Sequence, residues 1–444
     1  MTSRVGIRHE DMYQWERRVP LIPQDVRELV RNHAIDIVVQ SSPKRAYRDE
    51  EYRNVGITVS EDLSGCSVIV GIKEIPTEAF EEGKTYVFFS HTIKGQPYNM
   101  PMLKRMLELG CTLIDYEKVT DESDRRLIFF GNYAGLAGMI ETLWALGRRF
   151  SWEGIRTPLA GIDRALDYAD LATAKDAIRK IGRRISDEGL PESIAPLVVG
   201  FAGYGNVSRG AQEILDLLPV HEIAVEDLPS LARGGSALNN TIQKVVFKEE
   251  HMAEPIDTGR SFDLQEYYNH PERYRGIFER HIPHLDVLVN CIYWEPVYPR
   301  LLTKQLVREM VEENRLRVRV VGDISCDVEG AIECTVKATE PDNPVYVYDP
   351  IADGAIDGVE GAGPVVMAVE ILPSELPREA SAYFSGILKG YVPAIARADF
   401  SRDLESCGLP APIRRAVIAY RGELTPDYRY IERYLSTDNA SNPT

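Results

Sequence analysis

A glycine-rich segment in the middle of the chain has the residue types of a dinucleotide-binding loop. Residues 197–210 read LVVGFAGYGNVSRG, so an apolar run leads into Gly203 and Gly205, and a helical pattern follows. Glycines at this spacing allow a tight turn and let the backbone approach a pyrophosphate at the N-terminus of the next helix. The pattern predicts a cofactor site, with an ordinary glycine turn as the alternative. Its residues are Gly203, Gly205, Asn206, Val207 and Ser208.

Charged residues beyond this loop bear on which dinucleotide would bind. Asp227 lies 22 residues after Gly205, close to the spacing of about 20 at which an acid binds the ribose of NAD. Arg233 is nearby and could instead pair with the 2′-phosphate of NADP. Later apolar runs add three more cofactor candidates, which are Ile292, Asp323 and Asp327. The residues themselves leave NAD and NADP both open.

A second set of candidates follows three apolar runs in the first third of the chain. Lys73 and Glu74 follow CSVIVGI, His91 follows TYVFFS with Lys94 three residues on, and Glu117 follows CTLIDY. Ligands of open α/β sheets bind at such strand ends, and a His and a Lys beside carboxylates can exchange protons. Any one of these charges alone is more often a solvated loop residue. Together they predict a site for a substrate with both anionic and cationic groups.

Strands that alternate with helices would position both the cofactor candidates and the charged substrate-site candidates. Strands are expected at residues 4–7, 35–40, 66–72, 85–90, 111–116, 197–202, 222–225, 285–291, 318–323 and 345–348. Helical patterns cover residues 23–33, 100–109, 131–150, 171–188 and a segment from about residue 373. Residues 235–284 read as an insertion of irregular loops with a short helix.

This alternation predicts an α/β protein with two doubly wound Rossmann-like domains and a cleft between them. A substrate-side domain is expected from residues 1–134 plus 371–444, and a dinucleotide-binding domain from residues 135–370. The chain has 51 Lys and Arg against 68 Asp and Glu, which gives a net charge of −17. So acidic a chain is a poor partner for nucleic acid or an anionic membrane surface.

Compartment and metal content follow from the cysteines and from the first residues. Six cysteines are scattered without a CxxC pair, and His281 and His284 lack a third ligand, so neither disulfides nor a metal are expected. The start, MTSRVGIRHEDMYQWERR, has neither the apolar stretch of a signal peptide nor the composition of a transit peptide. A cytoplasmic location is expected, with no membrane or nucleic-acid partner, and the oligomeric state is left open.

Several stretches together resemble one known family. They include GIRHEDMYQWERRVPLIP (6–23), VGIKEIP (70–76), FFSHTIK (88–94), GYGNVSRGAQ (203–212) and CIYWEPVYPRLLT (291–303). They resemble the lysine–ketoglutarate reductase half of plant and animal aminoadipic semialdehyde synthases and, more distantly, the fungal lysine-forming saccharopine dehydrogenases. The glutamate-forming half of the bifunctional enzymes has no counterpart here. The fold is also similar to that of alanine dehydrogenase and the transhydrogenase nucleotide-binding subunit.

The resemblance implies that L-lysine condenses with 2-oxoglutarate and that NAD(P)H reduces the imine to saccharopine, reversibly. It implies acid–base roles for Lys73 and His91. It implies substrate contacts for Arg18, Glu74, Lys94, Glu117 and Arg126. It favours NADP(H) as cofactor, with NAD(H) possible. A related opine-type dehydrogenase that uses another amine, or a nucleotide-sensing protein without catalysis, are the alternatives.

Overall fold

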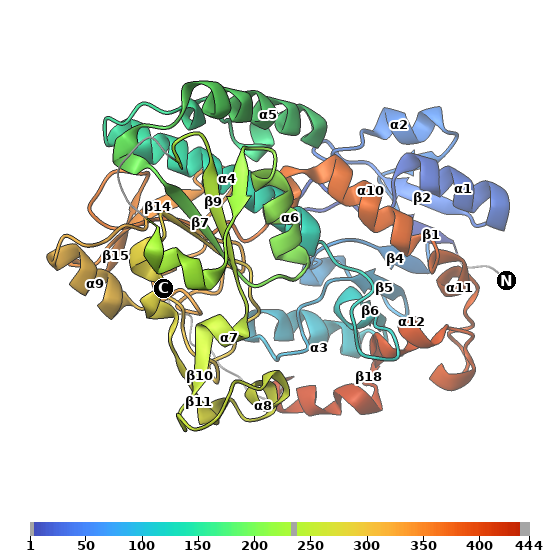
Figure 1. Cartoon of the computed structure of the whole chain (residues 1–444). Coiled ribbons are helices and arrows are strands. Elements are labelled where there is room, and N and C mark those ends of the chain that lie inside the picture. The colour runs from blue at the N-terminus through green and yellow to red at the C-terminus, as the bar shows by residue number, and fades with distance from the viewer. Residues whose placement is uncertain (1–3, 232–237, 436–444) are drawn as a thin grey trace. The chain divides into compact units, whose positions relative to one another are not determined.

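The computed structural model describes residues 4–231 and 238–435 and divides into two compact units (Figure 1). The first unit consists of Met1–Phe130 with Pro377–Thr444, and the second is Gly131–Leu376. The chain therefore leaves the first unit once and returns to it once. None of the helices in the described ranges combines the length and the apolar character that a membrane crossing requires.

The first unit is built on an eight-stranded sheet in the order β18-β17-β6-β5-β4-β1-β2-β3. The strands from β1 to β6 pair in parallel, and β17 joins β6 antiparallel. The strands are β1 (Val5–Ile7), β2 (Ile37–Gln40), β3 (Thr58–Ser60), β4 (Val68–Val70), β5 (Thr85–Phe88), β6 (Thr112–Asp115), β17 (Val417–Tyr420) and β18 (Glu423–Leu424). The helices are α1 (Pro23–His33), α2 (Asp49–Asn54), α3 (Met100–Glu108), α10 (Pro377–Leu388), α11 (Val392–Arg397), α12 (Ala411–Arg415) and α13 (Glu432–Leu435).

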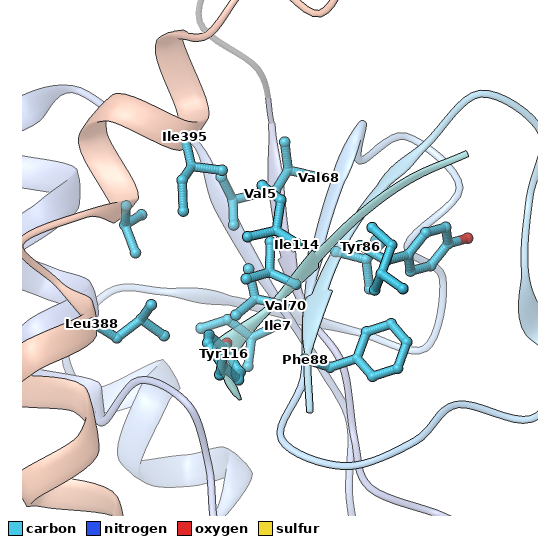
Figure 2. Close-up of a cluster of buried hydrophobic side chains, with 14 of the residues drawn as sticks. Val5, Ile7, Val68, Val70, Tyr86, Phe88, Ile114, Tyr116, Leu388 and Ile395 are labelled. Carbon is cyan, nitrogen blue, oxygen red and sulfur yellow. The ribbon is translucent and has the colours of Figure 1, made fainter. Parts of the chain in front are cut away.

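Apolar side chains of these strands and helices form the core of the first unit. Strands β4 and β1 are buried along their whole length, as expected for a parallel sheet covered on both faces. Figure 2 shows Leu388 of α10 and Ile395 of α11 directed toward the strand residues Val5 and Ile7. The segment after residue 377 therefore completes the core that the first 130 residues begin.

The second unit holds another eight-stranded sheet, in the order β15-β14-β16-β13-β12-β7-β9-β8, and a two-stranded ribbon of β10 and β11. The strands are β7 (Leu197–Ala202), β8 (Val220–Glu222), β9 (Ile242–Phe247), β10 (Ala253–Pro255), β11 (Tyr274–Gly276), β12 (Val287–Asn290), β13 (Val320–Asp323), β14 (Val345–Asp349), β15 (Gly354–Asp357) and β16 (Val365–Met367). The helices are α4 (Gly131–Trp152), α5 (Leu171–Glu188), α6 (Asn206–Leu215), α7 (Glu249–Met252), α8 (Leu264–Asn269) and α9 (Lys304–Glu312). Two mainly parallel sheets with helices confirm the predicted α/β fold with two Rossmann-like units.

Two local predictions were wrong in this second unit. The strand expected at 222–225 is β8 at Val220–Glu222, and residues 225–230 form a 3₁₀ helix. The insertion expected at 235–284 contains β9, which pairs with β7 over six residues. A lysine at position 244 suggests an exposed segment, yet Lys244 is buried in this strand. Its burial is possible because Asp216 and Glu222 each lie 2.9 Å from the Lys244 amine and pair with it.

Candidate functional site

In the first unit, the carboxyl ends of neighbouring parallel strands bring the predicted charged residues to one edge of the sheet. Lys73 and Glu74 follow β4, His91 follows β5, and Glu117 follows β6. Strands β4, β5 and β6 are neighbours in that order. Residues far apart in sequence therefore meet where open α/β sheets bind their ligands.

His91 and Glu74 form a directly bonded pair at this edge. The Nδ1 atom of His91 contacts Oε1 of Glu74, and the Asn99 amide donates to the His91 carbonyl oxygen at 3.3 Å. Burial would raise the pKa of Glu74, but the hydrogen bond and charge of His91, together with Lys73, lower it below its usual range. A carboxylate on Nδ1 fixes the tautomer of the ring and leaves Nε2 for a substrate.

Lys73 lies beside two buried carboxylates that the sequence did not single out. Its backbone N–H donates to Oε2 of Glu10 at 3.0 Å, and its amine lies 5.4 Å from the ring centre of Tyr13. Burial, together with the charge of Glu16, raises the pKa of Glu10 to about 7. Burial would raise the pKa of Glu16, but the charge and hydrogen bonds of Arg18, together with the charge of Lys73, lower it. One carboxyl that binds a proton near neutral pH, that of Glu10, therefore lies at the backbone of Lys73.

Arg18 is buried in an ion pair instead of standing open to solvent. Its Nε and Nη2 atoms donate to the two carboxylate oxygens of Glu16, at 2.8 and 2.5 Å. Its guanidinium lies 4.2 Å from the ring centre of Phe130, and only 4% of the residue is exposed. Glu16 comes two residues before the predicted Arg18 in the same ERR stretch, yet nothing in the sequence distinguished it from a surface acid.

The remaining candidates of this unit lie nearer the surface. Arg126 is exposed and pairs with Glu117 at 3.0 Å, whereas Lys94 is exposed and its backbone N–H donates to Gln96. Asp115, also missed, accepts hydrogen bonds from the backbone of Glu117 and from Ser90. Burial and the charge of Glu117 raise the pKa of Asp115 to about 6.

In the second unit, the glycine segment forms the predicted strand, turn and helix. Strand β7 ends at Ala202, Gly203 adopts a φ of +94°, and Gly205 precedes the first residue of α6, Asn206. A side chain at Gly205 would meet no atom within 4 Å, so the space above the loop is open. Ser208 is fully buried in the first turns of α6. The loop therefore has the open backbone surface that a pyrophosphate requires.

The other cofactor candidates differ in how exposed they are and in whether they approach the glycine loop. Asp227 is exposed in the 3₁₀ helix after β8, and Arg233 lies outside the described residues. Ile292 approaches the glycine loop, since its methyl group lies 3.0 Å from where a Cβ of Gly203 would be. Asp323 is buried, whereas Asp327 is exposed.

Asp323 uses its carboxylate within the protein. It accepts from the Asn290 amide at 2.9 Å, the Thr335 hydroxyl at 2.6 Å and the Cys326 backbone at 3.2 Å. Burial raises its pKa to about 6 in spite of these bonds. It thus ties the ends of β12 and β13 together.

A cavity of about 360 Å³ opens beside the glycine loop. Its walls include three glycine-loop residues, aromatic residues of the region predicted as an insertion, and the chain after β12. Lining residues that the sequence did not indicate are Tyr204, Glu249, Met252, Tyr267, Tyr268 and Tyr298. No spacing rule finds them, because they come from four separate segments: the glycine loop, α7, α8 and the chain after β12.

Comparison with known proteins places this geometry in a family context. Residues 6–137 match the family model described as alanine dehydrogenase/PNT, N-terminal domain. The chain is 40% identical to the alpha-aminoadipic semialdehyde synthase of Arabidopsis thaliana, across 97% of the chain and 41% of the relative. It is 35% identical to the mitochondrial enzyme of that name from Rattus norvegicus, across 97% of the chain and 47% of the relative. The chain thus spans less than half the length of these relatives.

A shorter relative is matched over most of both chains. The saccharopine dehydrogenase [NAD(+), L-lysine-forming] of Yarrowia lipolytica is 28% identical, across 84% of this chain and 87% of that protein. Among solved structures, L-alanine dehydrogenase matches with a TM-score of 0.58 at 17% identity, across 98% of this chain and all of that one. A transhydrogenase from Sinorhizobium meliloti matches with a TM-score of 0.56 at 15% identity, across 95% and 99%.

The two structural likenesses show the fold alone, which is that of alanine dehydrogenase and transhydrogenase. The sequence matches confirm the predicted resemblance. Over nearly its whole length, the chain is a relative of the alpha-aminoadipic semialdehyde synthases and, more distantly, of the lysine-forming saccharopine dehydrogenases.

Proposed function

We propose that the chain is an NAD(P)H-dependent lysine–2-oxoglutarate reductase, an oxidoreductase acting on a CH–NH bond. It joins the ε-amine of L-lysine to the carbonyl carbon of 2-oxoglutarate and reduces the imine to saccharopine, reversibly. The observation that carries the proposal is the bonded His91–Glu74 pair with Lys73 on the adjacent strand end. The names of the relatives support this substrate pair.

The proton steps need groups that bind and release protons near neutral pH. The lysine ammonium must lose a proton before its nitrogen attacks, and the carbonyl oxygen must gain protons before it leaves as water. His91, oriented by Glu74, would take the first proton at Nε2, and Lys73 would give a proton to the oxygen. Glu10 and Glu16, which flank Lys73, can buffer its charge.

The substrate charges suit the other predicted residues. Two carboxylates of 2-oxoglutarate would face cations, for which Arg18, Lys94 and Arg126 are proposed, while Glu74 and Glu117 would face the cationic amine. Because Arg18 already holds Glu16 through two nitrogens, it can offer a substrate only its remaining donors. Residues 1–134 with 371–444 would thus bind the substrates, and residues 135–370 the cofactor.

The residues of the second unit fit a nicotinamide dinucleotide, which would supply a hydride to the imine carbon. The open surface at Gly205 and the first turn of α6, from Asn206 through Ser208, would hold the pyrophosphate. Ile292 would border it, Arg233 could pair with a 2′-phosphate, and Asp323 and Asp327 would lie toward the nicotinamide. NADPH is the preferred form expected from the family resemblance, whereas the Yarrowia relative is named for NAD(+).

The chain would act on small molecules only and in the cytoplasm, although the rat relative is named as mitochondrial. The decisive experiment mixes the purified chain with 2-oxoglutarate, NADPH or NADH, and each amine of a panel. Oxidation of the cofactor should depend on L-lysine, and mass spectrometry should identify saccharopine.

Two results would contradict the proposal. Turnover with another amine in place of lysine would indicate a different opine-type dehydrogenase. A rise in melting temperature with cofactor, but no turnover with any amine, would indicate a nucleotide sensor. In the same assay, Lys73→Met should slow lysine-dependent oxidation by roughly 100-fold or more.

A further inference from the structure

The strand order of the second unit puts an unexpected residue next to the glycine loop. In a dinucleotide-binding sheet, the strand beside the glycine-loop strand ends in the acid that binds the adenosine ribose. Here that neighbour is β9, because Ala202 pairs with Phe247 and the Gly203 N–H donates to the Phe247 carbonyl at 3.0 Å. The residues that follow β9 are Lys248 and Glu249.

Strand β8, by contrast, lies at the edge of the sheet. It pairs only with the first half of β9, from Val220 opposite Ile242 to Glu222 opposite Lys244. Asp227, which follows β8, is therefore one strand further from the glycine loop than the usual order would put it. Among the described residues that line the cavity beside the loop, Glu249 is present and Asp227 is not.

The lining of the cavity has the chemistry of a site for an aromatic base. Tyrosine rings come from the glycine loop (Tyr204), from α8 (Tyr267 and Tyr268) and from the chain after β12 (Tyr298). The ring centres of Tyr268 and Tyr298 lie 6.5 Å apart and the two ring planes meet at 89°, which is an edge-to-face arrangement. Helices α7 and α8, which carry part of this wall, can be followed in Figure 1. Aromatic faces of this kind stack on nucleobases.

The carboxylate of Glu249 is held in place at this wall by neutral donors. The Tyr268 hydroxyl donates to it at 2.6 Å and the Tyr204 hydroxyl at 3.1 Å. Within the described residues, no Lys or Arg forms an ion pair with Glu249. A carboxylate has about four acceptor positions, so two hydroxyl groups of a ribose could still donate to it. A phosphate in their place would face an uncompensated negative charge.

We infer that this cavity binds the adenosine half of the dinucleotide and that Glu249, instead of Asp227, accepts the ribose hydroxyls. The inference rests on the proposed function, since it needs a dinucleotide on the glycine loop. The tyrosines stack on the adenine, and Glu249 selects against a 2′-phosphate, so this site favours NADH over the NADPH that the family resemblance suggests. The residues predicted as an irregular insertion therefore contribute to cofactor specificity.

Isothermal titration of the full chain with NADH and NADPH, without amine or oxoacid, tests the role of Glu249. Glu249→Gln, which keeps the size of the side chain, should lower the ratio of Kd(NADPH) to Kd(NADH) by about tenfold or more. Asp227→Asn is the matched control and should leave this ratio within about twofold. A ratio that changes in Asp227→Asn, or in neither variant, would overturn the inference.

Adenosine 5′-monophosphate, which lacks the nicotinamide half, tests the aromatic wall separately. Tyr268→Phe and Tyr268→Leu both lose the hydroxyl, but only the second loses the ring. The leucine variant should bind this nucleotide about tenfold more weakly than the phenylalanine variant. Equal binding by the two, with NADH still bound by the wild type, would overturn the inference alone. If the wild type binds neither NADH nor NADPH, the proposed function fails as well.

Discussion

Two side chains on adjacent strand ends are expected to handle the protons of the reaction. Lys73→Met and His91→Gln should each lower kcat by roughly 100-fold or more, because no other group replaces a positioned acid or base. Cofactor affinity should stay near that of the wild type, since neither residue belongs to the second unit. Single-turnover kinetics and cofactor titration measure the two effects. Lys104→Met, an exposed lysine of α3, is the control. Turnover near the wild-type rate in the double variant would refute the assignment.

Arg18 combines a predicted substrate role with a structural one. Its ion pair with Glu16 is almost fully buried, and removing one partner of such a pair typically costs about 3–5 kcal/mol. Arg18→Met should therefore lower the free energy of unfolding by about that amount, measured by urea denaturation. The double variant with Glu16→Gln should recover part of the loss, because no charge is left unpaired. Unchanged stability, with a higher KM for 2-oxoglutarate, would mean that Arg18 serves the substrate alone.

The glycine loop allows its two glycines to be tested apart. Gly205→Val should prevent cofactor binding without lowering the melting temperature, because its side chain would enter open space where the pyrophosphate lies. Gly203→Val should lower both the cofactor affinity and the melting temperature, since Gly203 has a φ of +94° and lies against Ile292. Cofactor titration and thermal melting measure the two quantities. Normal cofactor affinity in Gly205→Val would show that the loop has only a structural role.

Elements with strong local signals were predicted closely from the sequence. Helix α1 has Pro23 at its first position, and α5 begins after Asp170, whose side chain accepts from the Thr173 N–H. Elements that depend on distant partners were missed. Strand β17 joins the first sheet by pairing with β6, about 300 residues earlier in the chain, and no local pattern reveals such a neighbour.

The same limit applies to the site. Lys73, Glu74 and His91 could be predicted because each directly follows an apolar run. Glu16 could not, because its importance comes from burial beside Arg18. Glu249 follows a strand whose place in the sheet only the structure gives. Sequence reasoning thus finds residues at strand ends, whereas strand order decides which of them meet.

The molecule as a whole consists of two units, and the second of them contains two buried acids, Glu141 and Glu375. Glu375 comes just before the chain returns to the first unit at Pro377, and Glu141 is in α4, which begins the second unit. Both carboxyls are buried, with Arg164 3.4 Å from Glu141. Burial and the charge of Glu141 raise the pKa of Glu375 well above its usual range. The folded protein therefore binds a proton at Glu375 more tightly than the unfolded chain does.

This proton makes stability depend on pH in a definite direction. A raised carboxyl pKa contributes stability that is fully present below the ordinary pKa of a glutamate and is lost as the pH rises through the raised value. The melting temperature should therefore fall from mildly acidic to alkaline pH, with at most about 1.4 kcal/mol lost per pH unit from this one group. Glu375→Gln, which is neutral at every pH, should flatten that slope. Glu360→Gln, an exposed acid of the same unit, should keep the wild-type slope. If Glu375→Gln melts with the wild-type pH dependence, Glu375 is already ionised in the folded protein and another group must compensate its charge.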